Sequence, residues 1–413
     1  MLKFIGADTA RDLFVDVPSS AMVDGKVNLP DHKSELEVER VMNGYANQNL
    51  PASGAPFFLG AGTYFHHVPS TVDYIIQRSE YLTAYTPYQP EIAQGTLQAV
   101  FEFQTFIAQL TGQEVANASL YDGATSMTEA ALMAMRITKR RKIILGNAIH
   151  RDYRKVLHTY MSNFDDIVIE DAAAPTDDAA CIIVQSPDFY GNSKAIKDLR
   201  AQCDETGALL IVVVTEILSL GLLPAPEEAD VVCGEAQSIG LAMSYGGPHL
   251  GFFACRQKYV RQIPGRLCGI TKDAEGKRGF VLTLNTREQH IRRDKATSNI
   301  CTNQGLCALA FTVHMSLLGE DGFKDLARLN HEAACRAADA LTAINGVELV
   351  NETFFNEFTV QLPSDAKAAV QALADKGIIA GLALKDNQLL VAVTEMTTDA
   401  DIDALVDGLK GAL

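Results

Sequence analysis

The sequence predicts an α/β protein built on a mainly parallel sheet that lies between two layers of helices. Apolar, β-branched runs recur along the middle of the chain, at 142–145, 166–169, 181–184, 209–214 and 229–233. Stretches with helical periodicity, at 151–161 and 194–205, separate several of these runs. Strands that alternate with helices form parallel sheets, and unbroken apolar runs are typical of strands buried on both faces. We therefore expect a three-layer α/β domain.

The chain is long enough for more than one domain. Its 413 residues, 47% of them hydrophobic, exceed the size at which a single core stops growing. Residues 1–55 carry three prolines and one helical stretch at 34–42, without alternation of strand and helix, which indicates an N-terminal arm. The large α/β domain is expected at 56–318, with an apolar helix at 306–318 as its last element.

A small α+β domain is expected at 319–413. An alanine-rich helical stretch at 330–344 opens it. Short strands at 357–362 and 388–393 then alternate with helices at 366–374 and 399–409.

Composition excludes several classes of protein. The formal net charge of −16 argues against a general nucleic-acid binder. No run of about 18 apolar residues indicates a membrane span, and the N-terminus does not resemble a secretion signal, so we expect a cytoplasmic protein. Eight cysteines are scattered without a Cys-x-x-Cys pair, which favours buried reduced thiols over disulfides or a metal site.

The stretch 208–255 predicts which α/β fold this is. A buried strand ends near Glu216, a second strand follows at 229–233, and the glycine-rich turn at 244–248 leads into a third. This order is that of the aminotransferase-like, fold type I proteins that use pyridoxal phosphate, in which an acid holds the ring nitrogen and a lysine forms the Schiff base. No lysine lies between Lys197 and Lys258. The scaffold is therefore predicted without its nucleophile.

Several residues are candidates for a vestigial cofactor pocket. Ser126 and Glu129 have the spacing of a capping box, which predicts a helix N-terminus where a phosphate could bind, although most capped helix starts hold no ligand. The strand at 181–184 ends in a turn at the predicted ligand-binding edge of the sheet. An acid–proline pair is expected after Val214, and Thr215 and Glu216 stand there instead. The pocket candidates are Thr125, Ser126, Asp188, Glu216 and His249.

Two polar segments are candidates for contacts outside this pocket. Residues 60–67 and 81–95 are rich in glycine, tyrosine and proline, which indicates either a packed crossing loop or the lining of a site for a polar ligand or a neighbouring subunit. Residues 287–295 hold four cations and two acids, as a solvated helix can, but the small polar residues at 297–299 that follow also suit contacts to a phosphate, a carboxylate or a partner. The candidates are Tyr85, Thr86, Tyr88, Gln89, Glu91, Arg287, His290, Arg292, Arg293, Thr297, Ser298 and Asn299.

Long motifs over nearly the whole chain resemble one family. They are YTPYQPEIAQG at 85–95, LTG at 110–112, VANAS at 115–119, GGPHLGFF at 246–253, PGR at 264–266 and TREQHIRRDKATSNICTNQ at 286–304. The chain resembles the P-protein, or glycine decarboxylase, of the glycine cleavage system. It is similar to the first, or α, subunit of the split form of that enzyme.

The resemblance implies a function that explains the missing lysine. In that family the cofactor lysine belongs to the second, or β, subunit, and the α subunit helps to build the site at the interface of a heterotetramer. The implied reaction removes CO2 from glycine and passes the aminomethyl group to the lipoyl arm of the H-protein, with the T- and L-proteins as functional partners. Pyridoxal phosphate is expected on the β subunit and not covalently on this chain, which is expected to hold no metal and no catalytic residue of its own.

Two other hypotheses stay open on the sequence alone. The chain could be a stand-alone pyridoxal phosphate decarboxylase or aminotransferase that uses Lys258, Lys272 or Lys277, although these lysines come late for the usual position. It could also be a structural pseudoenzyme that offers no group to a partner's site.

Overall fold

The computed structural model describes residues 1–23, 25–193 and 196–413. It divides the chain into two compact units, Met1–Pro51 and Ala52–Leu413. The predicted domain boundaries at residues 55 and 318 stay predictions.

The first unit consists of short helices joined by extended segments. They are α1 (Leu2–Ile5), 3-10 turns at Ala10–Leu13 and Ser19–Ala21, and α2 (Glu35–Ala46). The N-terminus of α2 is capped because the backbone N–H of Ser34 donates to the Glu37 carboxylate at 2.9 Å. None of the residues in α1 or α2 is buried. The described part of this unit therefore has no core of its own.

The second unit is organised around a seven-stranded sheet with the strand order β1-β7-β6-β5-β4-β2-β3. Strands β6, β5, β4, β2 and β3 are parallel, whereas β7 is antiparallel to both β6 and β1. The strands are β1 (Val115–Ala116), β2 (Lys142–Leu145), β3 (Val168–Asp171), β4 (Ala179–Gln185), β5 (Leu209–Val214), β6 (Val231–Glu235) and β7 (Gly251–Cys255). The mainly parallel sheet is as predicted.

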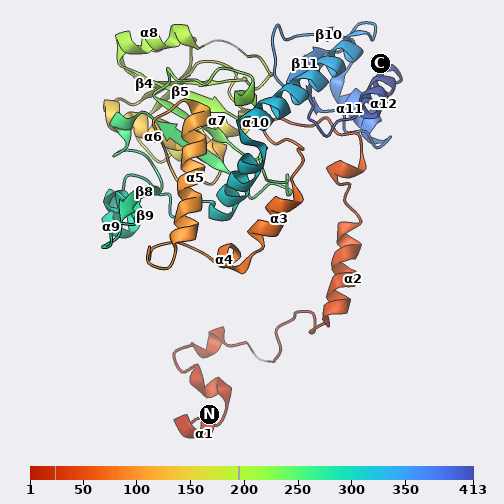
Figure 1. Cartoon of the computed structure of the whole chain (residues 1–413). Helices are drawn as coiled ribbons and strands as arrows, with labels where there is room; N and C mark the ends of the chain where they lie inside the picture. The colour runs from red at the N-terminus through yellow and green to blue at the C-terminus, as the bar shows by residue number, and fades with distance from the viewer. Residues whose placement is uncertain (24, 194–195) are drawn as a thin grey trace. The chain divides into compact units, whose positions relative to one another are not determined.

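Helices cover both faces of this sheet. Neighbouring residues of a strand point to opposite faces, so each strand contributes side chains to two cores. Ile143 packs in one core with Met127 of α6 and Leu157 of α7, whereas Ile144 packs in the other with Phe103 of α5 and Phe311 of α10. The helices are α5 (Gln94–Thr111), α6 (Gly123–Thr138), α7 (Arg151–Met161), α8 (Lys197–Thr206) and α10 (Gly305–Thr342) (Figure 1). The three-layer prediction is confirmed; the first two residues of the predicted helix 194–205 lie outside the described residues.

A second, four-stranded antiparallel sheet follows, in the order β10-β11-β13-β12. Its strands are β10 (Glu348–Leu349), β11 (Glu357–Gln361), β12 (Leu382–Ala383) and β13 (Gln388–Ala392), and α11 (Ala366–Ala374) and α12 (Asp399–Lys410) pack on it. Helix α10 joins the two sheets and is broken at Gly319, whose backbone (φ 63°, ψ −173°) is not helical. The segment before the large sheet also joins this core, since Phe58 is fully buried there and Phe57 pairs with Ile379.

The remaining elements of the second unit lie outside these layers. They are α3 (Ser70–Ile76), α4 (Ser79–Leu82), a separate two-stranded sheet of β8 (Leu267–Lys272) and β9 (Arg278–Thr283), and α9 (Gln289–Arg292). The sequence reading did not predict the β8–β9 pair. All eight cysteines are free thiols, and six of them are buried. Across the described residues, no helix has both the length and the apolarity that a bilayer crossing requires.

Candidate functional site

The carboxyl ends of β4, β5 and β6 meet at one edge of the large sheet, where fold type I proteins hold their cofactor. Gln185, Glu216 and Gln237 stand at these ends and are all buried. Glu216 follows β5 by two residues, and one of its oxygens accepts from the Leu218 N–H at 3.0 Å, which caps a 3-10 helix. The edge therefore carries polar side chains that need partners inside the protein.

Gln237 lies just beyond β6, and its amide is fully engaged. Its oxygen accepts from the Tyr64 N–H at 3.0 Å, and its nitrogen donates to the carbonyls of Tyr64 at 3.1 Å and Leu241 at 2.8 Å. The side chain is 1% exposed. A glutamine with both ends of its amide bound to backbone is a structural anchor and offers no nucleophile.

The Glu216 carboxylate meets a histidine from a distant part of the chain. His66 Nε2 is 3.1 Å from Glu216, and His66 Nδ1 is 2.8 Å from Glu395. Burial lowers the pKa of His66, but the two carboxylates outweigh burial and raise the pKa to about 10. Burial raises the pKa of Glu395, but His66 outweighs it and lowers that pKa to about 2. The histidine is therefore a cation at neutral pH, held between two carboxylates.

The N-terminus of α6 lies at the same edge and is occupied by the chain's own carboxylates. Asp122 accepts from the Thr125 N–H at 2.7 Å, and Glu235 accepts from the Gly123 N–H at 3.0 Å. The predicted helix start at Ser126 is wrong, because Asp122 is the N-cap and Ser126 donates its hydroxyl to the Asp122 carbonyl within the helix. Burial raises the pKa of Glu235 to about 7.

The other pocket candidates are also placed by the structure. Asp188 accepts from the Tyr190 and Asn192 N–H groups and so closes the turn after β4. Thr125 is buried in α6, and His249 is half-buried on the turn before β7. His150, which the sequence reading did not single out, places Nε2 2.7 Å from the Ala61 carbonyl. Its only sequence signal was its position after β2 at the carboxyl edge.

The tyrosine-rich and arginine-rich segments, 81–95 and 285–304, lie against each other, and the Cys301 N–H donates to the Tyr121 hydroxyl at 3.0 Å. Arg266 joins them, because its guanidinium donates to the Tyr88 hydroxyl at 3.1 Å and to the Cys301 carbonyl at 2.9 Å. The Tyr88 and His290 rings meet edge to face at 5.7 Å. A cavity of about 40 Å³ lies between the segments, lined in part by Tyr85, Arg266 and Asn303.

The candidate residues of these two segments differ in exposure. Tyr85 is 80% exposed, whereas Arg287 is buried and donates to backbone carbonyls, among them that of Gly265 at 3.1 Å. Those that are exposed are Tyr85, Tyr88, Gln89, Glu91, His290, Arg292, Arg293 and Asn299. Those that are half-buried are Thr86, Thr297 and Ser298.

The comparisons with known proteins agree with this geometry. The family model described as "Glycine cleavage system P-protein" matches residues 1–409. The chain belongs to this family. A protein of Xanthobacter autotrophicus named "Probable glycine dehydrogenase (decarboxylating) subunit 1" is 55% identical, over 100% of this chain and 97% of its own length.

Solved structures show the same fold. A crystal structure of a glycine decarboxylase (P-protein) of the glycine cleavage system, in inhibitor-bound form, matches with a TM-score of 0.94 at 40% identity, over 100% of this chain and 97% of that one. A C-DES variant with glycine covalently linked to its pyridoxal phosphate cofactor matches with a TM-score of 0.62 at 14% identity, over 88% of this chain and 98% of that one. The latter likeness shows the fold alone. This P-protein chain therefore has the fold type I architecture predicted from its sequence.

The residues at the carboxyl edge do not fit pyridoxal phosphate. No lysine lies between Lys197 and Lys258, and Gln237, which follows β6 by two residues, has its amide bound to the Tyr64 backbone. The acid after β5 is ion-paired with His66, and the helix N-terminus that would bind phosphate already binds two carboxylates. A phosphate dianion beside Asp122 and Glu235 would also meet like charge. No chemical step is therefore assigned to this edge.

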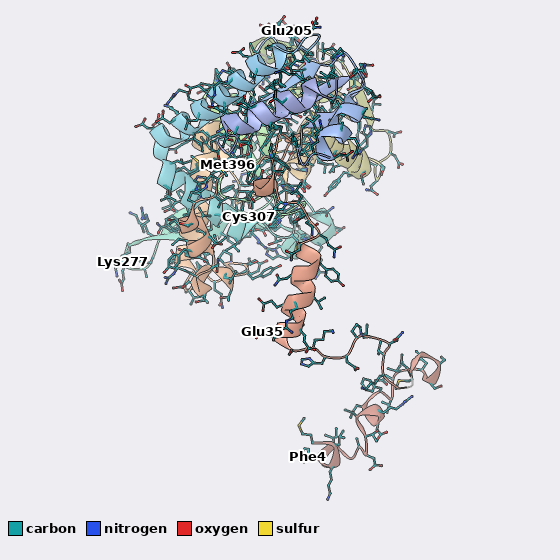
Figure 2. All side chains as sticks on the ribbon, turned by 90° about the vertical axis from the view of Figure 1, so that its right-hand side faces the viewer. Phe4, Glu35, Glu205, Lys277, Cys307 and Met396 are labelled. Atoms are coloured by element: carbon teal, nitrogen blue, oxygen red, sulfur yellow. The ribbon has the colours of Figure 1, made fainter. Side chains whose placement is uncertain are left out.

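The three late lysines lie elsewhere. Lys258 Nζ is 3.7 Å from Asp230, which precedes β6 and so stands at the opposite, amino edge of the parallel strands. Lys272 ends β8, and Lys277 lies at the far tip of the β8–β9 hairpin (Figure 2) with its side chain 75% exposed. None of them reaches the carboxyl edge, which disfavours the stand-alone enzyme.

Proposed function

We propose that this chain is the subunit of glycine decarboxylase that does not carry the cofactor lysine. With a lysine-bearing partner subunit it decarboxylates glycine and transfers the remaining aminomethyl group to a lipoyl arm. The observation that carries the proposal is the absence of a lysine between Lys197 and Lys258, a stretch in which the buried Gln237 has both ends of its amide bound to backbone. The names of the relatives support the reaction, and "subunit 1" supports a partner.

The proposal assigns pyridoxal phosphate to the partner and the polar loops to the interface. Exposed Tyr85, Arg292 and Arg293 can donate hydrogen bonds or present positive charge to the partner's site or to the H-protein. Glycine itself carries a carboxylate, for which arginine is the fitting donor. The complex works with the lipoyl H-protein, and functionally with the T- and L-proteins, as a heterotetramer. Eight free thiols support the cytoplasm as its compartment.

The decisive experiment combines the chain with its lysine-bearing partner and measures CO2 release from glycine. We expect turnover by the complex and none by either chain alone. The variants Tyr85→Ala and Arg292→Ala should assemble normally and slow turnover. Arg328→Ala is the matched control, because Arg328 is a half-exposed arginine on α10 outside both loops. Glycine turnover by this chain alone would refute the proposal.

The same variants separate this proposal from a structural pseudoenzyme. If Tyr85→Ala, Tyr88→Phe and Arg292→Ala all leave turnover as unaffected as Arg328→Ala does, the loops contribute nothing to the partner's site and the structural role is favoured. A covalent cofactor on the isolated chain, trapped by borohydride, would instead favour the stand-alone enzyme.

A further inference from the structure

We propose that residues 60–67, here called the clasp, are a built-in occupant of the cofactor pocket, and that the clasp, rather than the missing lysine alone, keeps pyridoxal phosphate out of this chain. The inference extends the proposed function, which places the cofactor on the partner. It gives a physical reason why this chain does not bind the cofactor itself.

The clasp bonds to side chains that follow three strands at the carboxyl edge. Its Tyr64 backbone holds Gln237, which follows β6 by two residues in the stretch that lacks a lysine. Its His66 ring is ion-paired with Glu216, the acid after β5. Its Ala61 carbonyl is 2.7 Å from the ring of His150, the N-cap of α7 in the connection after β2. The connections after three parallel strands thus bond to the clasp at the carboxyl edge, where ligands of parallel sheets bind.

The clasp is equally bound on its other side, to the small sheet. Glu357 of β11 accepts from the Ala61 N–H at 2.6 Å and from the Tyr64 hydroxyl at 2.9 Å. Glu395, beyond β13, accepts from the His67 N–H at 2.7 Å. Tyr64 and His66 are only 3% and 5% exposed. The clasp therefore lies between the two sheets and ties them together.

The clasp packs closely against the residues around it. A Cβ on Gly60 would come within 2.5 Å of the Glu357 carboxylate, and one on Gly62 would be 3.0 Å from His150 Nε2. Gly62 also has a φ of +95°, which favours glycine. Two positions of the clasp thus have a steric reason to be glycine, as expected of a segment that fills its site.

Displacing the clasp would separate a buried ion pair from its partners. A ligand that binds only the released state is weakened by the fraction of molecules in that state. Separation of a buried pair lowers that fraction, and with it the apparent affinity, by a factor on the order of 10³. This cost does not depend on whether a lysine is present, so occupancy by the clasp adds a barrier to that of the missing nucleophile.

The test measures binding of pyridoxamine phosphate, which has no aldehyde to react with surface lysines, to the full-length chain by equilibrium dialysis. The wild-type chain should retain none, whereas His66→Ala, in which the clasp loses its ion pair, should retain it. Arg328→Ala, on the surface of α10, is the control and should behave as the wild-type chain does. Retention by the wild-type chain would overturn the proposal.

Amide hydrogen exchange tests whether the clasp occupies the edge in solution, and it needs no variant that binds the cofactor. In wild-type chain the amides of Tyr64 and His67 should exchange as slowly as those of β5. Fast exchange there would overturn the proposal, because the clasp would then not occupy the edge in solution.

In His66→Ala the same two amides should lose protection while β5 keeps it. Unchanged protection would overturn the role of His66, and a released clasp in His66→Ala without retained pyridoxamine phosphate would show that something else excludes the cofactor. Glycine turnover by the complex is measured separately, so failure of the clasp leaves the proposed function standing.

Discussion

The carboxyl edge of the large sheet and the two polar loops at 81–95 and 285–304 use similar residue types in opposite ways. At the edge, the buried His66 is ion-paired with the buried Glu216 and with the partly buried Glu395. On the loops, Tyr85 and Arg292 are exposed. Buried charges that satisfy one another hold a structure together, whereas exposed aromatic and cationic groups are available for a partner. The comparison supports our proposals that the residues at the carboxyl edge have a structural role and that the loops supply the groups that act with the partner.

The largest effect should come from breaking the ion pair at the edge. His66→Ala leaves Glu216 and Glu395 buried without their cation, which should cost roughly 3–5 kcal/mol in the free energy of unfolding, measured in urea. Glu332→Ala is the control, because it breaks a pair with Arg328 on the surface and should change stability little. Equal losses of unfolding free energy in the two variants would contradict the expected difference between buried and exposed charges.

Arg266 joins the two loops through its guanidinium, and its replacement should cause the second-largest loss of stability. Its guanidinium donates to Tyr88, Cys301, Thr302 and Asn303. Arg266→Ala should therefore cost roughly 2–4 kcal/mol in urea unfolding and also slow glycine turnover by the complex. Arg266→Lys keeps the charge but not the planar fork, so it should recover only part of both losses. Full recovery would show that charge alone matters there.

Stability should also vary with pH in a way that identifies the clasp. The pKa of His66 rises from 6.5 to about 10, so its contribution is complete below pH 6.5 and is lost as pH rises toward 10. The slope from one such proton is at most about 1.4 kcal/mol per pH unit. His66→Gln should flatten the unfolding free energy between these two pH values. An unchanged pH profile in that variant would contradict the buried cation.

Below pH 7, the stability should depend on the ionisation of two carboxyl groups. Burial raises the pKa of Glu357 from 4.5 to about 7, so its ionisation removes stability as pH rises through this range. The lowered pKa of Glu395, about 2, has the opposite sign and removes stability as pH falls below 4.5. Glu357→Gln should therefore reduce the slope of the profile between pH 4.5 and 7, where Glu235, with a pKa also raised to about 7, still contributes, and should leave the acid limb unchanged.

The Tyr64 hydroxyl contributes one hydrogen bond, to Glu357 at 2.9 Å. Tyr64→Phe should lower the free energy of unfolding by about 1–2 kcal/mol, because the buried carboxyl group loses a donor. Thermal unfolding of both proteins at the same pH measures the difference. A more stable variant would mean that the hydroxyl has no structural role at the edge.

The smallest effect on stability should come from the loops. Tyr85→Ala should change the free energy of unfolding by no more than about 0.5 kcal/mol, since the side chain is 80% exposed. Turnover by the complex should nevertheless fall. A large loss of stability with unchanged turnover would reverse the comparison between the edge and the loops.

Much of the architecture could be predicted from local pattern. The run Leu209–Val214 is apolar at every position, so it had to be a strand covered on both faces, and it is fully buried as β5. The helix start at Ser126 was predicted wrongly because Asp122 also has a side chain that can cap. Asp122 caps the helix, and Glu235 of β6 completes the cap by accepting from Gly123, a contact between residues 112 positions apart that local spacing does not reveal.

The sequence by itself determined the sheet, its covering helices and the lack of a lysine between Lys197 and Lys258. Only the tertiary structure decided that His66 meets Glu216, 150 residues away, and Glu395, 329 residues away. The physical reason is that apolar periodicity acts over neighbouring residues, whereas a buried ion pair depends on where the fold brings distant segments together. For the same reason, the missing lysine can be seen in the sequence, whereas the position of residues 60–67 at the carboxyl edge cannot.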